Sequence, residues 1–450
     1  MMKFYNRLIN KKNNNINLSP PSLLALGFLS FIVIGTLLLK LPFAQKIEVS
    51  WLDTLFTATS AVTITGLSVV DVGQVYTLFG QVVVMLLIQC GGLGFMTFAI
   101  LAALSLSSKI GLKQQVMAQE TTGQTSLAHA TFTVKGVLLY SLFFEGIGTL
   151  ILTGTWMQSY PFGDALFYAI FYSISSFNNG GFSLFPNSLM SFSGQYMITL
   201  TISLLYIIGG LGFVVLMDIK RAHSWKKLSA NSKLVLCTIA GLNLFAFISI
   251  WAIEASNPLT LAQMSIGDQA LNAWFHATVP RSAGFNSLEI SHMRDPATLI
   301  TMLLMFIGGG SLSTAGGIKV GTFIIMVLSV LSFLRRSDEI RIFNHSVSPT
   351  TTYKALAVIA ITSMLTVIGF FSLLLLEPNK SFLDLLFEAL SAACTVGLSR
   401  GITADLHPLS LLTLIILMFT GRLGPLTLAY LIATPKKSRL SHPSTDIQIG

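Results

Sequence analysis

One short pattern, built around a glycine, occurs four times in this sequence and constrains the possible folds more than any other feature. A hydroxyl-bearing residue lies six positions before each glycine, and a large aromatic residue lies ten positions before it. A bulky apolar residue and then a small polar residue follow each one. The central glycines are Gly66, Gly181, Gly284 and Gly397. Matches at this many positions indicate an internal fourfold repeat.

Long apolar runs separate the copies of the pattern. Only 10% of the 450 residues are charged, against about 25% in soluble domains. Eight runs are long enough to cross ~30 Å of hydrocarbon as helices. They lie near 22–41, 78–104, 136–156, 197–217, 234–253, 297–334, 355–376 and 410–433. The sequence therefore predicts an all-α integral membrane protein with eight transmembrane helices and both termini on one side.

A shorter apolar segment precedes each glycine, at about 52–62, 164–177, 269–279 and 382–393. Eleven helical residues cover ~16 Å, about half of the bilayer. Such a segment can enter the membrane but cannot span it, and exposed backbone at that depth is tolerated only where it lines an aqueous cavity walled by protein. We therefore expect four re-entrant pore loops around one pseudo-fourfold pore. A single copy would be explained equally well as a plain turn, but four copies in register favour the pore.

The narrowest part of this pore is expected to be built from backbone carbonyls. Glycine permits backbone angles at which successive carbonyls turn to one side, and a ring of carbonyl dipoles can replace the hydration shell of a monovalent cation. The predicted filter residues are Thr63, Ile64, Thr65, Gly66, Asn178, Asn179, Gly180, Gly181, Arg281, Ser282, Ala283, Gly284, Cys394, Thr395, Val396 and Gly397.

The predicted domain organisation follows the pattern. Repeats are expected at 20–105, 132–220, 230–336 and 353–434, between an N-terminal tail, 1–19, and a C-terminal tail, 435–450. Of 27 Lys and Arg residues, 19 lie in the tails and in the connections on the same side as the tails. By the positive-inside rule, both termini are predicted to be cytoplasmic. The net charge of +9 is explained by this topology rather than by nucleic-acid binding, although a basic face could also dock a partner.

The third repeat contains a glycine-rich segment, 308–317, inside a hydrophobic stretch longer than one crossing requires. Five glycines and three hydroxyl residues within 308–318 are unfavourable in a helix interior. We predict a broken helix and a flexible intramembrane loop below the filter, where it could obstruct the pore; the alternative is a cytoplasmic linker. The predicted gate residues are Gly308, Gly309, Gly310, Ser311, Ser313, Thr314, Gly316, Gly317, Lys319 and Arg422.

Three cations are predicted to lie within the membrane. A charge there usually faces an aqueous path or a partner, so Lys319 and Arg422 could form an electrostatic barrier beside the loop, unless they extend to the interface. Arg281 would repel cations if it pointed into the filter. Its side chain is therefore predicted to turn away and to pair with Glu388 or Glu145, although both acids could be satisfied locally. His276 is interpreted as a packing residue.

The motifs resemble those of the superfamily of K⁺ transporters that comprises Trk, Ktr and HKT proteins. The similarity is greatest to the membrane subunits of Ktr systems, the KtrB group, and extends over about 20–435. It rests on six short segments: 63–67, 177–183, 280–287, 308–317, 395–398 and 421–425. The resemblance implies four M1-P-M2 units around one K⁺-selective filter, with 308–317 as the gating loop and Arg422 facing it. Glycine at all four central positions resembles the K⁺-transporting branch.

The resemblance also implies partners. Ktr membrane subunits are typically homodimers on a cytoplasmic ring of RCK-type (KtrA-like) subunits that bind ATP or ADP. No cofactor is expected in this chain, whose sequence shows no such nucleotide-binding domain.

The predicted function is potassium uptake across the plasma membrane, with dependence on Na⁺ left open by the sequence. The nearest alternative is a Na⁺ or poorly selective monovalent cation transporter of the same fold. An enzyme is not expected, because the sequence contains neither a His-Glu-x-x-His motif nor a Gly-x-Ser-x-Gly motif. A non-conducting scaffold would have no use for the fourfold pattern.

Overall fold

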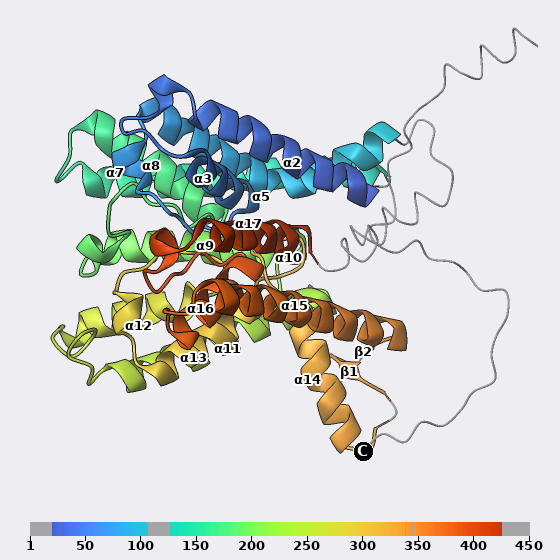
Figure 1. Cartoon of the computed structure of the whole chain (residues 1–450). Coiled ribbons are helices and arrows are strands. Elements are labelled where there is room, and N and C mark those ends of the chain that lie inside the picture. Colours follow the sequence, from blue (N-terminus) through green and yellow to red (C-terminus); the bar gives the residue numbers. More distant parts are fainter. Residues whose placement is uncertain (1–19, 107–126, 338, 344, 425–450) are drawn as a thin grey trace, which may run out of the picture.

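The computed structural model describes residues 20–106, 127–337, 339–343 and 345–424. The predicted tails, 1–19 and 435–450, lie outside the described residues, as does the end of the last apolar run. Within the described part the chain is almost entirely helical (Figure 1). The exception is a two-stranded antiparallel hairpin, β1 (Arg341–Ile342) and β2 (His345–Ser346), which the sequence did not predict.

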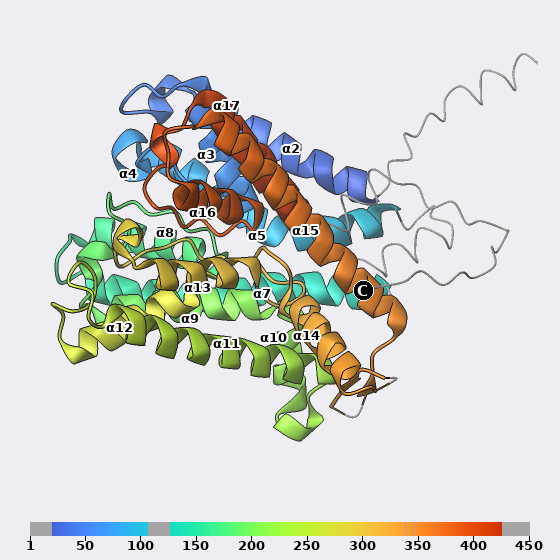
Figure 2. The ribbon, with the colours of Figure 1, turned by 60° about the horizontal axis from the view of Figure 1, so that its bottom comes forward.

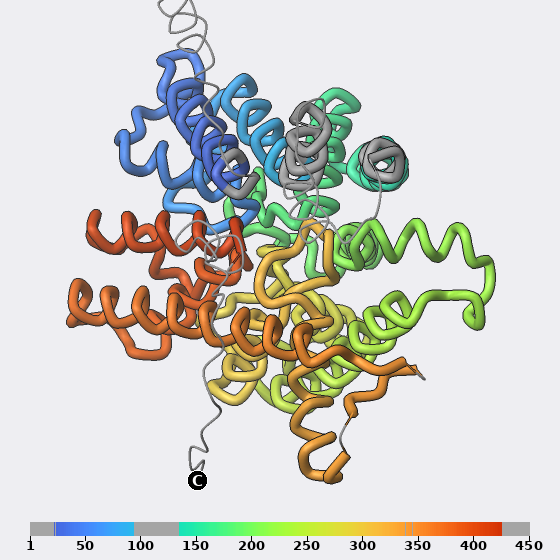
Figure 3. Tube along the Cα trace, turned by 90° about the vertical axis from the view of Figure 1, so that its right-hand side faces the viewer, coloured from blue at the N-terminus to red at the C-terminus, as the bar shows by residue number. Residues whose placement is uncertain are grey.

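The helices form four groups that surround a common centre (Figures 2 and 3). In three groups the short helix packs between its two neighbours in the chain, whereas in the third it packs against the preceding helix and against the last helix of the second group. The groups are α2 (Pro20–Leu39), α3 (Trp51–Thr63) and α5 (Leu78–Leu106); α7 (Leu127–Trp156), α8 (Phe162–Phe177) and α9 (Tyr196–Leu211); α11 (Ala230–Glu254), α12 (Ile266–Thr278) and α13 (Asp295–Phe306); and α15 (Pro349–Leu376), α16 (Phe382–Ala393) and α17 (Pro408–Leu423). Between the groups lie α4 (Val72–Val75), α10 (Phe213–Ala222), α14 (Val320–Leu334) and the short 3₁₀ turns η1 (Pro42–Ala44), η2 (Met190–Phe192), η3 (Trp225–Lys227), η4 (Ile290–His292) and η5 (Thr403–Asp405).

The short helices α3, α8, α12 and α16 have 12 to 16 residues, too few to cross a bilayer. Two of them begin with the same cap. The amide of Asp53 donates to Ser50 Oγ at 3.1 Å, and the amide of Asp268 donates to Ser265 Oγ at 3.2 Å. Each hydroxyl in turn donates to the carboxylate of that aspartate. The acid also lies in the first turn, where it complements the helix dipole.

Three described helices are long and apolar enough to cross a membrane: Lys135–Trp156 within α7, together with α11 and α15. The run near 197–217 is not one straight crossing, because α9 ends at Leu211 and α10 leaves it at 91°. Gly212 has φ +96°, a left-handed value that permits this bend. The sequence predicted a helical crossing over 197–217, whereas the structure has two helices that meet at a bend there. The long stretch at 297–334 is divided into α13 and α14, with residues 307–319 non-helical between them.

In three of the four groups the aromatic residue ten positions before the glycine is buried in the core. Phe56, Phe171 and Phe387 are fully buried. In the third group Phe275 takes the buried place, whereas Trp274 is half-buried and its Nε1 donates to Ser203 Oγ at 3.3 Å. Phe171, Phe275 and Phe387 belong to one apolar core, whereas Phe56 packs in a second cluster with residues of α16.

Candidate ion-conduction site

The four central glycines lie next to one another in a closed ring. A β-carbon added to Gly66 would come within 2.8 Å of Gly180 O and 3.0 Å of Gly181 Cα, and one added to Gly181 would come within 2.8 Å of Gly284 Cα. A β-carbon on Gly284 would lie 3.4 Å from Gly397 Cα, and one on Gly397 would lie 2.9 Å from Gly66 Cα. Each glycine therefore contacts the next, and the fourth contacts the first. Side chains are excluded from the ring.

The backbone around the ring alternates in handedness. All four glycines have positive φ, from +69° to +92°. The residue two positions before each one, which is not glycine, also has positive φ: Ile64 +55°, Asn179 +59°, Ser282 +73° and Thr395 +48°. Such angles are uncommon for residues with a β-carbon, and their repetition at one position in all four copies marks a strained conformation held by its surroundings.

A short non-helical segment, called a strand below, follows each short helix and ends at the central glycine. Hydrogen bonds to the short helices hold these four strands. In the first strand the amides of Thr65 and Gly66 donate to Ser60 O and Ser60 Oγ, at 2.9 and 3.0 Å. The fourth strand repeats this arrangement, since the amides of Val396 and Gly397 donate to Ser391 O and Ser391 Oγ, at 2.8 and 3.1 Å. The amides are thus satisfied by the helix behind the strand. The amides therefore do not compete for the strand carbonyls, one of which, Thr395 O, accepts from Ser282 Oγ at 2.6 Å.

The hydroxyl six positions before the glycine has a different partner in the other two copies. Ser175 Oγ donates to Phe182 O at 3.0 Å, and Thr278 Oγ1 lies 2.6 Å from the Tyr206 hydroxyl. The recurring hydroxyl is therefore buried in every repeat and bonds to the strand region in three of them, whereas Thr278 bonds to α9 and to its own helix. The sequence pattern identified the position but not its partners.

A cavity of about 300 Å³ opens on one side of the ring. All four central glycines line it, together with Ser68, Ser183, Asn286 and Ser399, the small polar residues two positions beyond them. Asp71 and Glu289 also line the cavity. A water-accessible, acidic mouth of this kind concentrates cations in front of the ring.

Arg281 does not form the ion pair that the sequence predicted for it. Its side chain is buried, and its Nη1 lies 3.4 Å from Ile239 O on α11, so it reaches behind the strand. Pairing with Glu388 or Glu145 was wrong, because Arg281 forms no ion pair within the described residues. Both acids are instead satisfied locally. Glu145 accepts from Gln89 and Asn178, and Glu388 accepts from Ser399 and Thr403.

The glycine-rich segment 308–317 lies against the opposite side of the strands from the cavity. Thr314 Oγ1 donates to Asn179 Oδ1 at 3.0 Å, and the amide of Gly316 donates to Ser282 Oγ at 2.9 Å. A β-carbon on Gly316 would collide with Thr395 Oγ1. The segment thus touches the left-handed residues of three strands.

The two embedded cations hold this segment by its carbonyls. Arg422, at the end of α17, donates from Nη1 to Thr314 O at 2.7 Å and from Nη2 to Gly91 O at 3.1 Å. Lys319 Nζ donates to Ala315 O at 2.6 Å. The arginine therefore connects the segment to α5, on the far side of the ring from α13.

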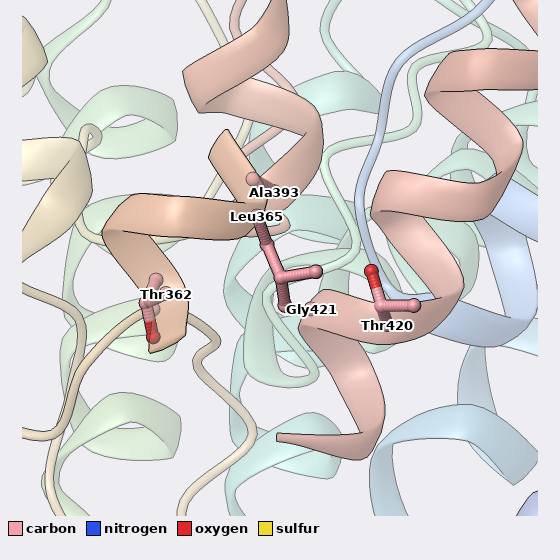
Figure 4. A pocket seen from close by; sticks show the side chains of 6 residues that line it. Thr362, Leu365, Ala393, Thr420 and Gly421 are labelled. Carbon is pink, nitrogen blue, oxygen red and sulfur yellow. The ribbon is translucent and has the colours of Figure 1, made fainter. Parts of the chain in front are cut away.

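A small cavity of about 20 Å³ adjoins the end of the segment (Figure 4). Its walls are residues from α15, α16 and α17 together with one glycine of the segment: Thr362, Leu365, Ala393, Thr420, Gly421 and Gly317. This volume holds about one water molecule.

Two polar features of this region were missed in the sequence. His276 is more than a packing residue, because its Nε2 accepts from the Leu288 amide at 3.1 Å. Arg400 follows the fourth strand and pairs with Asp384 at 2.6 Å, while its Nη1 donates to Thr298 Oγ1 at 3.1 Å. It therefore connects the third and fourth groups of helices. Arg400 follows Ser399, the last position of the repeated pattern, which was the one available signal.

The fold and this ring define a membrane transport protein. The family model described as TrkH, cation transport protein, matches residues 22–441, and the chain belongs to that family. It is a transporter and not an enzyme, and the predicted family membership is confirmed.

Individual relatives agree over nearly the whole chain. The chain is 42% identical to the Ktr system potassium uptake protein B of Bacillus subtilis, over 97% of this chain and 98% of the relative. It is 38% identical to the protein of that name from Vibrio alginolyticus, over 96% and 95%, and 32% identical to the potassium/sodium uptake protein NtpJ of Enterococcus hirae, over 98% and 100%. The crystal structure of the potassium transporter TrkH from Vibrio parahaemolyticus has the same fold, with a TM-score of 0.74 at 20% identity, over 94% of this chain and 86% of that one.

Proposed function

We propose that this chain is the membrane subunit of a potassium uptake system and that K⁺ passes through the ring of four glycine strands. The carrying observation is the closed ring, in which four strands share an alternating backbone and two strands have their amides bonded away from the centre. Carbonyls arranged in this way suit a dehydrated monovalent cation. The names of the two Ktr relatives support K⁺ as the ion.

The alternative ion is Na⁺, and the name of the Enterococcus hirae relative gives it specific support. Expression of the chain in a bacterium that lacks its own K⁺ uptake systems separates the two. We expect growth at low K⁺ and Rb⁺ uptake that excess K⁺ inhibits but excess Na⁺ does not. Inhibition by Na⁺ at equal concentrations would favour the poorly selective transporter.

We infer that the full architecture has four M1-P-M2 repeats, with eight crossings and four pore loops in pseudo-fourfold order. The four helix groups and the 12 to 16 residues of the short helices support it. The charge distribution supports cytoplasmic termini in the plasma membrane. Thiol labelling from either side of the membrane checks this orientation. In a chain whose three native cysteines are replaced by serine, Asn187→Cys is expected to react from outside and Ser224→Cys from inside.

We propose that residues 308–317 form the gate. Its contacts with Asn179, Ser282 and Thr395 support this role, because they place the segment against three of the four strands. Arg422 and Lys319 hold its carbonyls and add positive charge below the ring. Opening requires these bonds to be exchanged for others.

We also propose that the gate responds to a separate Ktr-type regulatory protein, as the names of the two Ktr relatives suggest. An RCK-type ring that binds ATP or ADP would meet the basic face at the end opposite the 300 Å³ cavity, and the membrane subunit would be a homodimer. Co-purification of the chain with a KtrA-like protein, and a change in Rb⁺ flux between ATP and ADP, would support this assembly. Equal flux in both nucleotides would contradict the regulation.

A further inference from the structure

Helix α10 runs at right angles to the helix that precedes it. The bend of 91° at Gly212 turns the chain out of the direction of α9. Figure 3 shows α10, in bright green at the right, extending outward from the centre of the bundle. If α9 crosses the bilayer, α10 lies along the membrane plane.

The two faces of α10 differ in the manner of an interfacial helix. Phe213, Val215 and Leu216 are buried against the rest of the protein. Ile219 is 41% exposed, and Trp225, in the 3₁₀ turn η3 that follows α10, is 51% exposed. Tryptophan side chains at the ends of membrane helices favour the headgroup level, because the ring is apolar and its N–H is polar.

Positive charge surrounds these exposed apolar side chains. Between 213 and 253 the chain has one acidic residue, Asp218, whose Oδ2 accepts from the Ser229 amide at 3.0 Å and is thereby used to position the start of α11. Within the described residues, none of the cations of this segment forms an ion pair. They are Lys220, Arg221, Lys226, Lys227 and Lys233.

We propose that α10 and η3 form a binding surface for the headgroups of anionic phospholipids in the cytoplasmic leaflet. A basic amphipathic helix lying in the interface binds such lipids through both its apolar contacts and its charge. A soluble acidic protein would match the charge alone and would leave Ile219 and Trp225 without an apolar environment. The combination of cations with exposed apolar groups therefore favours the lipid surface.

This surface is connected to the glycine-rich segment. The amide of Phe213 donates to Leu312 O at 3.1 Å, and the amide of Gly310 donates to Gly210 O at 2.8 Å. A β-carbon on Gly212 would collide with Ser311 O. Lipid that holds α10 in place also holds one edge of the segment, so we expect ion flux to depend on anionic lipid. The expected dependence of ion flux on lipid rests on the proposed gate.

The test uses the fluorescence of Trp225 in the full chain, reconstituted in phosphatidylcholine vesicles. Bromine near the headgroup quenches a tryptophan that touches the lipid, and a Trp225→Phe variant gives the signal of the other four tryptophans for subtraction. At equal bromine content, brominated phosphatidylglycerol is expected to quench Trp225 more than brominated phosphatidylcholine does. Each lysine near an anionic surface contributes a factor of about five to lipid attraction. The double variant Lys226→Gln, Lys227→Gln is therefore expected to lower the lipid preference about 25-fold.

The matched control is Arg335→Gln with Arg336→Gln, which removes two charges at the end of α14 and is expected to leave the quenching of Trp225 unchanged. Equal quenching by both brominated lipids would overturn the proposal, and so would absence of quenching by either, since protein would then cover the surface.

Rb⁺ flux is measured in the same vesicles. A lipid preference without any effect on flux would leave the binding surface in place and refute its link to the gate. Absence of Rb⁺ flux in every lipid would instead count against the proposed function.

Discussion

Gly66 combines a left-handed backbone, φ +92°, with no space for a side chain. Replacing it with serine is expected to displace the strand, at a cost of about 1–3 kcal/mol. We expect the preference for K⁺ over Na⁺ to fall roughly tenfold, which corresponds to ~1.4 kcal/mol. Competition of Rb⁺ uptake by Na⁺ measures it. Gly163→Ser is the control, because no atom lies within 4 Å of a β-carbon there. Unchanged selectivity of Gly66→Ser would count heavily against the filter.

Arg422 makes two hydrogen bonds to carbonyls, and one of them holds the glycine-rich segment. Hydrogen bonds to charged groups contribute about 1.5–3 kcal/mol. Loss of that contribution in Arg422→Gln is expected to favour the open segment and to raise Rb⁺ flux roughly tenfold. Arg341→Gln, at an exposed surface pair, serves as the control. If Arg422→Gln never reaches the membrane while the control does, the arginine has a structural role instead.

The glycine-rich segment itself gives a prediction for a whole element. Deleting 309–316 removes the hydrogen bonds that join the segment to Asn179 and Ser282, so flux is expected to increase. The milder change Gly316→Ala places a methyl group against Thr395 Oγ1 and should also open the segment. Gly321→Ala, which has open space around its β-carbon, is the control. If both the deletion and Gly316→Ala have wild-type flux, the segment is a linker and not a gate.

Arg400 is expected to stabilise the packing of the third group of helices against the fourth. Its removal in Arg400→Ala leaves Asp384 without its partner and breaks the bond to Thr298, at an expected cost of about 2–4 kcal/mol. Arg400→Lys should not restore the stability, because lysine cannot reproduce the planar fork. Lys380→Ala, which breaks a longer pair of 3.8 Å with an exposed Asp405, should cost less than about 1 kcal/mol. Thermal unfolding in detergent compares the three, and equal losses would contradict this role.

The sequence predicted the short helices and the interruption of the third repeat because both depend on local signals. Run length and glycine content are visible within about fifteen residues. The bend at Gly212 was missed, because glycines in membrane helices also serve close packing, as Gly209 does against Phe177 O. The partners of Arg281 and of the recurring hydroxyls were missed as well. They depend on contacts across helix groups, such as Arg281 with α11, that no local pattern records.

At the level of the whole molecule, four strands that are far apart in the chain meet at one ring, with an acidic cavity on one side and the glycine-rich segment on the other. This order of parts is what a gated cation path requires. The fold is shared with a potassium transporter at only 20% identity.

The central claim is that ions pass through this ring, and a structure of the protein determined in Rb⁺ tests it most directly. Rb⁺ is electron-rich and can be located by anomalous scattering. We predict density on the axis of the ring, coordinated by the backbone oxygens of residues 63–66 and of their counterparts in the other three strands. An axis without Rb⁺, or Rb⁺ bound only to Asp71 or Glu289 in the outer cavity, would contradict the account.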